Sequence, residues 1–473
     1  MPTVKVPIFE PIYTNVDNSE LNEQNFRVVD GYRTEAGGTT SRPGSSALFN
    51  ANTSEGFGVD GLLMWPEKNV VMAAGGGEIY QLTNTSNTPQ VTSLTNGTPL
   101  LNTNVPVSIV TDGTYCYFAN GGRIVYTAKD GTPAYIPDPD APTAVTHLAY
   151  LDGYLLAIDG SNKFYWCDVN AGLSWNALSF ASASGSSDNI VALKVFNREV
   201  YLIGQRSVET WENDGTTPFI RVPGGFIESG CCAPYSVVTD ENNVYWLDEA
   251  RRLVRFNGKT VERLSTKFDR ELQSLSFVND AVVFKIVLDG YVFFVFQFRI
   301  ANKTLVYNQT SDDWGQWGTW SLEEASYDRW IGSSYVYAEQ WGYHLIGRRD
   351  RRVIAELSSS YTDDDGDVIA VDRLTGHLDF GTSKTKQSNE LRFRARRGQG
   401  LSSRTPKITL RYKIDNRNWS NWKEFSLGKV GEYDLILRDT RRNIFRTKQY
   451  QFRATDGVQI VFSNAEEDVE VLR

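Results

Sequence analysis

The chain has 473 residues and a formal net charge of -9, with only three histidines and four cysteines. Its 12 Trp, 23 Tyr, 24 Phe and 39 Gly, against three Met, favour strands and tight turns over helices. The cysteine pattern argues against a disulfide-rich secreted scaffold, and the acidic balance argues against a general affinity for nucleic acids.

No targeting or membrane segment is expected. Residues Met1 to Glu10 lack a basic region followed by an apolar core and a small-residue cleavage site. The longest apolar run, 281–298, is interrupted by Lys285 and by Asp289-Gly290, which predicts a hairpin and no membrane anchor. We therefore expect a protein that folds in a reducing cytoplasm.

Charge is unevenly distributed along the chain. Residues 382–473 carry 20 Lys and Arg against 11 Asp and Glu, or +9, which leaves 28 against 46, or -18, for residues 1–381. The C-terminal part is therefore predicted to be a separate electrostatic module. Residues 1–60 are rich in Asn, Glu, Gly, Thr and Ser, and we expect an extended N-terminal arm that wraps its own domain or reaches a neighbouring subunit.

Similar units follow one another over residues 61–381. Each has an apolar strand, a polar turn, an aromatic-rich strand and a third amphipathic strand, as in the two copies within 190–258. The first turn of a unit is the one between its first and second strands. It can be placed in seven units, at Glu67-Lys68-Asn69, Asp112-Gly113, Asp152-Gly153, Asn197-Arg198, Asn242-Asn243, Asp289-Gly290 and Trp341-Gly342. From Asn69 to Gly342 the mean step is 45.5 residues. This period predicts an all-β protein with a β-propeller of about seven blades over 61–381. Coincidental hairpin spacing in a β-rich protein is the alternative.

Helical periodicity is nearly absent, and the best short candidate lies around 267–275.

Beyond residue 381 the strands alternate cleanly. Leu391, Phe393 and Ala395 share one face, and Arg392, Arg394 and Arg396 share the other. Together with turns at Asp415-Asn416 and Asp456-Gly457, this pattern predicts a small β-sandwich-like module over 382–473.

Catalytic chemistry has few candidate residues. His147, His344 and His377 are not paired at metal-ligand spacing, so neither a zinc site nor a Ser/His/Asp triad is expected. The stretch from Ser311 to Trp317 is close to the Asp-box of glycosidase propellers but has one residue too few, and Asp415 to Trp419 is a second near-match. We predict no catalytic residue, no cofactor and no metal.

The acidic turn from Asp363 to Asp367 leaves one alternative open, because its carboxylates could hold a hard cation. It is shorter than an EF-hand loop, with Leu374 where the bidentate Glu would stand, so a solvated turn is favoured.

Two groups of residues are candidates for contacts with other chains. Arg392, Arg394 and Arg396 could meet phosphates or a partner's carboxylates, or could form a solvated strand face. Trp314, Trp317 and Trp320 are interleaved with glycines in a short stretch. This pattern suits an interface loop better than a packed strand, although burial in the core is the alternative.

Several segments resemble one family. They are Ser41-Arg42-Pro43-Gly44, the stretches 175–181 and 187–193, the stretch from Leu202 to Trp211, and Gly230-Cys231-Cys232-Ala233. These segments are similar to the packaged-DNA stabilisation proteins, or tail hub (nozzle) proteins, of short-tailed bacteriophages. The similarity covers most of the chain, with the central segment its most specific part and 361–380 its weakest.

The resemblance implies a structural, non-enzymatic virion protein of the tail, made and assembled in the host cytoplasm. Proteins of this kind are propellers that form a six-fold ring below the portal and its adaptor, retain packaged DNA and extend its channel. They also anchor tail spikes or fibres and a distal plug or needle. An acidic body suits such a conduit, because a wall that does not bind phosphate lets DNA slide without sequence-specific binding.

Two rival functions remain open from the sequence. A glycan-binding or glycan-cleaving propeller would need an aromatic-lined pocket with paired carboxylates. A host-side interaction scaffold would need no ring.

Overall fold

The computed structural model describes residues 3–6, 26–34, 38–55, 58–94, 100–101, 105–186, 188–215, 218–264, 269–397, 405–429, 432 and 434–472. Residues 7–25 of the predicted arm lie outside the described residues. Within the described ranges α1 (Asp269–Ser274) is the one α-helix, at the position of the helical candidate, and η1 (Pro66–Lys68) and η2 (Pro234–Ser236) are short 3-10 turns. No helix in these ranges is long and apolar enough to cross a membrane.

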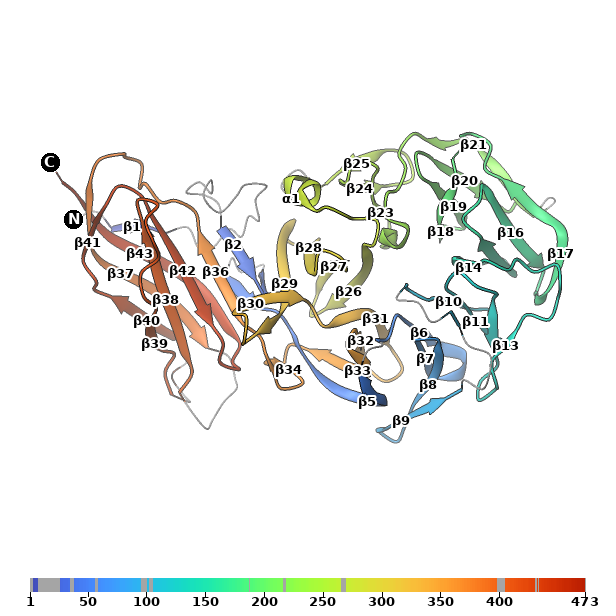
Figure 1. The fold of residues 1–473 in the computed structure, drawn as a ribbon, viewed down its shortest axis with the longest axis horizontal. Coiled ribbons are helices and arrows are strands. Elements are labelled where there is room, and N and C mark those ends of the chain that lie inside the picture. The colour runs from blue at the N-terminus through green and yellow to red at the C-terminus, as the bar shows by residue number, and fades with distance from the viewer. Residues whose placement is uncertain are drawn as a thin grey trace.

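In the described residues seven antiparallel blades of four strands each form a propeller, the right-hand body in Figure 1. Five blades are separate four-stranded sheets, and the other two continue into larger sheets. The first three blades contain β6 (Gly61–Trp65), β7 (Val70–Gly75), β8 (Glu78–Thr85), β9 (Thr88–Ser93); β10 (Ser108–Thr111), β11 (Cys116–Ala119), β12 (Val125–Thr127), β13 (Ala134–Tyr135); and β14 (His147–Leu151), β15 (Tyr154–Ile158), β16 (Lys163–Asp168), β17 (Ala171–Ser182). The next two contain β18 (Ile190–Phe196), β19 (Glu199–Gly204), β20 (Val208–Glu212), β21 (Ile220–Ile227); and β22 (Val238–Thr239), β23 (Val244–Leu247), β24 (Leu253–Phe256), β25 (Val261–Arg263).

The last two blades connect the propeller to the rest of the chain. Blade 6 contains β26 (Val282–Leu288), β27 (Tyr291–Phe298), β28 (Lys303–Asn308) and β29 (Asp313–Ser321), with β30 (Ser326–Arg329) paired to β29. Blade 7 contains β31 (Gly332–Ala338), β32 (Tyr343–Arg348), β33 (Arg351–Ser358) and, as its outermost strand, β5 (Gly44–Glu55). The N-terminal part of the chain therefore closes the ring.

All seven predicted turns connect the first and second strands of their blades. In Asp152-Gly153 and Asp289-Gly290 both residues have positive φ, at 50° and 88° and at 51° and 81°, as a type I′ turn requires. In Asp112-Gly113 only the glycine has positive φ, and the Asp112 carboxylate accepts hydrogen bonds from the N–H groups of Thr114 and Tyr115 instead. The predicted all-β propeller is confirmed.

The core is divided among the blade interfaces. Seven clusters of buried apolar side chains each lie between two neighbouring blades, and the last of them joins blade 7 to blade 1 through Phe49, Ile354 and Val71. A blade hides both faces against its neighbours, so the ring must close for every face to be buried.

A β-sandwich forms the left-hand body in Figure 1. One sheet contains β3 (Gly31–Arg33), β4 (Thr39–Ser41), β43 (Ile460–Val471), β37 (Lys386–Arg397) and β40 (Asp434–Asp439), with β1 (Thr3–Lys5) and β41 (Asn443–Phe445) paired alongside. The other contains β2 (Phe26–Val29), β36 (Val371–Thr375), β42 (Lys448–Ala454), β38 (Lys407–Ile414) and β39 (Lys423–Ser426). Phe393, Phe452 and Phe462 pack between the two sheets.

The sheets do not follow the boundaries drawn from sequence at residues 60 and 381. Strands of the predicted arm pair in the sandwich and in blade 7, and β36, inside the predicted propeller range, pairs with β42. β2 also pairs in parallel with β29 at Val29 and Gln316, so the sheet of blade 6 continues into the sandwich. The arm contains few alternating apolar residues because its strands add to existing sheet edges mainly through backbone hydrogen bonds.

A buried charge network joins these parts. Arg42 donates from Nε to Oδ1 of Asp30 at 2.7 Å and from Nη2 to Oδ2 of Asp364 at 2.6 Å. Its Nη2 also donates to the carbonyl of Gly318 on β29 at 3.0 Å, and the N–H of Gly318 donates to Asp30 at 2.8 Å. All three charged side chains are at least 97% buried. A guanidinium with no access to water is tolerated only because two carboxylates and a carbonyl surround it.

Replacing Arg42 tests the importance of this network. Arg42→Met leaves Asp30 and Asp364 buried without a cation, so the free energy of unfolding should fall by about 3–5 kcal/mol. The matched control is Arg33→Met, since Arg33 is 36% exposed and its ion pair with Asp313 spans 3.7 Å; it should cost less than about 1 kcal/mol. Urea unfolding followed by tryptophan fluorescence measures both, and equal small losses would contradict the expectation.

The same network predicts a pH dependence. Burial raises the pKa of Asp30 from 3.8 to about 6, against the opposing attraction of Arg42. Between these values the folded state binds a proton that the unfolded state releases, so acidification favours folding at this site. Relative to Asp30→Asn, the wild type should gain about 2 kcal/mol of unfolding free energy between about pH 7 and pH 4.5. Urea unfolding of both proteins at the two pH values measures this gain, and a constant difference would refute it.

Candidate interaction surfaces

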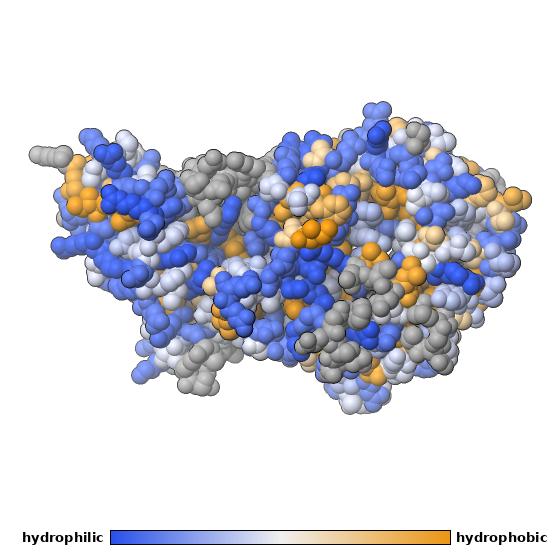
Figure 2. Space-filling model, in the orientation of Figure 1, coloured by the Kyte–Doolittle hydropathy of each residue, from blue (hydrophilic) through white to orange (hydrophobic). Residues whose placement is uncertain are grey.

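The arginine strand has the alternation that the sequence predicts. On β37 Leu391 and Phe393 are buried in the sandwich core. Arg392, Arg394 and Arg396 lie on the outer face, with 34%, 47% and 61% of their side chains exposed. In the view of Figure 2 the surface of the sandwich is largely hydrophilic.

Acidic side chains of the same sheet partly neutralise this arginine face. Arg394 donates from Nε to Oδ1 of Asp434 at 2.7 Å and also binds its Oδ2 through Nη2. Arg396 Nε is 4.0 Å from Asp434, and Arg392 Nε is 3.5 Å from Glu390. Exposed pairs of this kind contribute little to stability, so these guanidinium groups can exchange their partners at small energetic expense.

An apolar side chain lies within the arginine face. Ile436 stands directly opposite Arg394 on the neighbouring strand β40 and is 61% exposed. β40 ends its sheet, so its outer edge has no neighbouring strand among the described residues. Sequence analysis missed Ile436, because a single isoleucine in 434–439 does not show which way it points until the register is known.

The prediction of a tryptophan interface loop is wrong for two of its three members. Trp314 and Trp317 lie on strand β29 and are 4% and 1% exposed. They are three residues apart, so they point to opposite faces of the strand. Trp314 fills the cluster between blades 5 and 6, and Trp317 fills the one between blades 6 and 7.

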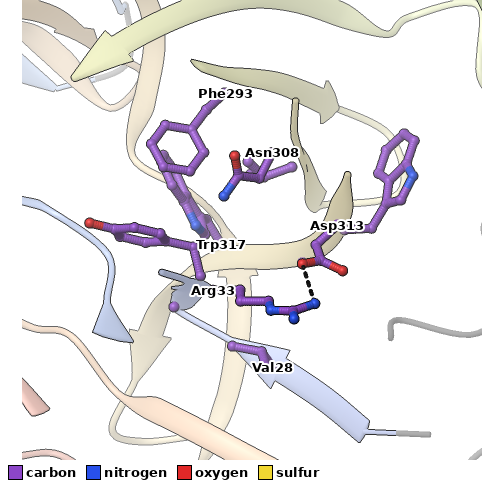
Figure 3. Close-up of a pocket in the computed structure, with 11 residues that line it drawn as sticks. Val28, Arg33, Phe293, Asn308, Asp313 and Trp317 are labelled. Carbon is purple, nitrogen blue, oxygen red and sulfur yellow. Dashed lines mark ion pairs between the residues drawn. The ribbon is translucent and has the colours of Figure 1, made fainter. Parts of the chain in front are cut away.

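Glycines in this stretch have a packing role. Figure 3 shows the seam where β2 and β3 lie against β29, with Trp317 and Phe293 on one side and the Arg33–Asp313 ion pair on the other. A Cβ on Gly318 would lie 3.0 Å from atoms of the paired strand β30. The Trp-Gly alternation therefore reflects dense packing against added strands, and it resembles a loop only in composition.

Trp320 is partly exposed and belongs to a stack of aromatic rings and guanidinium groups. Its ring lies 4.6 Å from the guanidinium of Arg453, which also lies 5.1 Å from Trp422. Arg411 follows, at 4.5 Å from Trp422 and 4.7 Å from Trp419. Since Trp320 belongs to blade 6 and the others to the sandwich, the stack attaches one body to the other.

The two near-matches to an Asp-box are structural turns. Asp312 has a left-handed backbone with φ of 51°, and its Oδ1 accepts a hydrogen bond from the Tyr307 hydroxyl at 3.0 Å. In the second near-match, the carboxylate of Asp415 accepts hydrogen bonds from the N–H groups of Arg446 and Thr447. Trp419, at the end of this near-match, stacks on Arg411.

The acidic turn is neutralised by arginines. β34 (Asp363–Asp364) and β35 (Asp367–Val368) form a small hairpin beside β5. Asp364 is bound by Arg42, and Arg348 lies 3.5 Å from Asp365 and 3.6 Å from Asp367. No group of three or more His, Cys, Asp or Glu suited to a metal ion occurs in the part of the chain that the structure describes. These carboxylates therefore do not fit a cation site.

The histidines do not form a catalytic arrangement with one another. His147 is buried and stacks on Tyr235, with ring centroids 4.9 Å apart, whereas His344 stacks on Tyr337 at 4.6 Å. The hydroxyl of Tyr335 hydrogen-bonds Nδ1 of His344 at 2.8 Å. The cysteines are all free thiols.

The segments that carry the family resemblance have structural reasons for their residues. A Cβ on Gly230 would lie 2.0 Å from the carbonyl oxygen of Gln205, so only glycine lets this segment approach the turn after β19. Trp246 Nε1 donates to the Gly230 carbonyl at 3.1 Å, and the Cys231 N–H donates to Gly204 at 2.9 Å. The motif joins blade 4 to blade 5.

The described residues thus define a seven-bladed propeller with a β-sandwich attached through its N-terminal strands. A family model described as "Bacteriophage P22 Gp10, beta-propeller" matches residues 25–362. Because the match spans more than half of the chain, the chain belongs to this family of phage structural proteins that stabilise packaged DNA, and it is a virion component. Residues 363–473 lie beyond the match.

Other comparisons add little. No curated protein sequence matches the chain. Similar solved structures include the computationally designed Ika8 protein (12% identity, TM-score 0.37, 66% of this chain and 99% of that one) and the N-terminal domain of Nup159 (11%, 0.36, 66% and 99%). A chain of a mitotic checkpoint complex is similar at 12% identity, with a TM-score of 0.39 and coverage of 63% and 89%. At TM-scores this low these similarities carry no argument.

Replacing Trp317 distinguishes a core residue from an interface residue. Trp317→Ala should lower the free energy of unfolding of the isolated protein by about 3–5 kcal/mol, because it leaves a cavity between two blades. Trp422→Ala is the control, since Trp422 is 36% exposed and its ring contacts the guanidinium groups of Arg411 and Arg453 on the surface of the sandwich. Its loss should be about 1 kcal/mol or less. Equal unfolding midpoints for Trp317→Ala and the wild type would restore the interface interpretation.

Proposed function

We propose that this protein is the tail hub, or nozzle, subunit of a short-tailed bacteriophage. It assembles as a ring, six-fold as in the proteins it resembles, below the portal and adaptor. There it extends the DNA channel, helps to retain packaged DNA until ejection, and anchors tail spikes or fibres and a distal plug. The observation that carries the proposal is the family match over residues 25–362.

Two features of the charge distribution support the proposed contacts between subunits. The arginine face carries exposed guanidinium groups around Ile436, and residues 1–381 have an excess of 18 negative charges. Complementary charge guides docking and fixes the register of two surfaces even where each pair adds little affinity. The acidic excess also suits a channel through which DNA slides without being bound.

A structural role without catalysis is part of the same proposal. The acidic turn is bound by arginines, and the two Asp-box near-matches serve as turns. No observation in the described residues favours the glycan-cleaving alternative. Hydrolysis of a host surface glycan by the isolated chain, abolished by changing one carboxylate, would overturn this part of the proposal.

A mass measurement tests the assembly directly. Native mass spectrometry of the purified chain, alone and with portal and adaptor proteins of its phage, should detect a ring that forms on or with the connector. A chain that stays monomeric in the presence of both proteins would contradict a hub.

The arginine face gives a sharper test. Arg392→Gln, Arg394→Gln and Arg396→Gln together should spare the fold, because Leu391 and Phe393 keep the core side of β37 intact. Incorporation into particles should fall, and fall further at high salt, where the remaining surface attraction is screened. DNA retention by the particles and the amount of incorporated protein are the measurements.

The matched control carries the same change of charge on the propeller. Arg198, Arg206 and Arg221 are exposed on blade 4, and their joint replacement by Gln should leave incorporation unchanged. Normal incorporation of the β37 variant, or an equal loss in both variants, would show that the arginine face has no specific role.

A further inference from the structure

The inner strands of the propeller line a partly open axial cavity of about 300 Å³. Its wall is built from the first strands of six blades, β6, β10, β14, β18, β26 and β31, together with η2 at the start of blade 5. The volume lies at the lower end of the range of small-molecule sites, which is roughly 300–1,000 Å³.

The wall combines polar and apolar groups. Leu62, Val107, Ile109, Val237, Val282 and Phe284 contribute side chains from successive blades. These side chains can pack against an apolar body, and the polar groups beside them decide which head group the cavity accepts.

Most polar groups of the wall already have partners within the protein. The hydroxyls of Ser333 and Ser334 donate to the carbonyl of Val59 at 2.6 and 2.9 Å. The carboxylate of Asp60 accepts from Arg299 at 3.1 Å. These groups leave neither a free negative charge nor a free donor toward the cavity.

Lys194 and Tyr235 are different. The ammonium of Lys194 on β18 and the hydroxyl of Tyr235 on η2 have no hydrogen-bond acceptor among the described residues, and both residues line the cavity. Burial lowers the pKa of Lys194, with no carboxylate to offset it. Nε2 of the neighbouring His147 is also buried without a hydrogen-bond partner, and Lys194 is the cation among these three groups.

His147 links these two donors and adds no charge. It stacks on the Tyr235 ring, and burial, followed by the positive charge of Lys194, lowers its pKa to about 3. His147 is therefore neutral at pH 7, and Lys194 is the uncompensated charge of the described wall. One positive charge in this wall matches a monoanion, whereas a dianion would leave one negative charge without a partner.

We propose that the axial cavity binds a small organic carboxylate. The carboxylate accepts hydrogen bonds from the Lys194 ammonium and the Tyr235 hydroxyl, and an apolar body of about ten atoms packs against Val107, Ile109 and Val282. This site is independent of the arginine face and of the assembly proposed above.

Calorimetric titration of the full chain with benzoate and with benzyl alcohol tests this site. The two probes share the ring and differ in the charged head. Benzoate should bind at least about tenfold more tightly, because a hydrogen bond to a charged group in a low-dielectric site exceeds a neutral one. Equal affinities, or no binding of benzoate, would overturn the proposal.

Variants test whether the preference for benzoate over benzyl alcohol arises in this cavity. Lys194→Met should abolish the preference for benzoate while benzyl alcohol still binds, which shows that the cavity is intact. Tyr235→Phe keeps the ring on His147, removes only the hydroxyl and should weaken benzoate severalfold. The control Lys259→Met changes an exposed lysine and should leave both affinities unchanged. If benzoate binds Lys194→Met and Tyr235→Phe as tightly as the wild type, the proposed site is wrong.

Discussion

The burial of Arg42 is the constraint on which the assembly of this chain depends. A guanidinium shielded from water needs both Asp30 and Asp364, and those residues are 334 positions apart in the sequence. Arg42 directly follows β4, a strand of the sandwich, and lies two residues before the start of β5, the strand that closes blade 7. Closure of the propeller ring and attachment of the sandwich are therefore coupled in the native structure, since the same buried cation contacts residues that belong to both.

Further contacts make the two bodies continuous. β2 continues the sheet of blade 6 into the sandwich, and the contact between Trp320 and Arg453 joins the same blade to β42. Gly44 shows how close this packing is, because a Cβ there would lie 2.4 Å from the carbonyl oxygen of Asp363. The sandwich is thus held to blade 6 both by backbone hydrogen bonds and by side-chain packing.

Local chemistry explains what could be predicted from the sequence. Asp-Gly and Asn-containing turns favour their own conformation, so the spacing of the turns was sufficient to place all seven and to predict about seven blades. The alternation of Leu391 and Phe393 with arginines likewise gave the correct faces of β37. In contrast, β5 contains only Leu48 and Phe49 as large apolar residues, and its place at the edge of blade 7 depends on a partner more than 300 residues away. Trp314 and Trp317 were misassigned because glycine beside tryptophan is common to loops and to tightly packed strands, and only the tertiary neighbours distinguish them.

The structure shows where the positive charges of the C-terminal part lie. Part of the positive charge of residues 382–473 is internal, since Lys448 is paired with Glu467 in the sandwich core and Arg453 with Asp372 of β36. The outer face keeps Arg392, Arg394 and Arg396, and these are already paired loosely within their own sheet. Exchanging one exposed carboxylate for another changes the free energy little. These arginines can therefore select a register between surfaces, and the affinity of any such contact must come from apolar area, for which the exposed Ile436 at the centre of the arginine face is the nearest source.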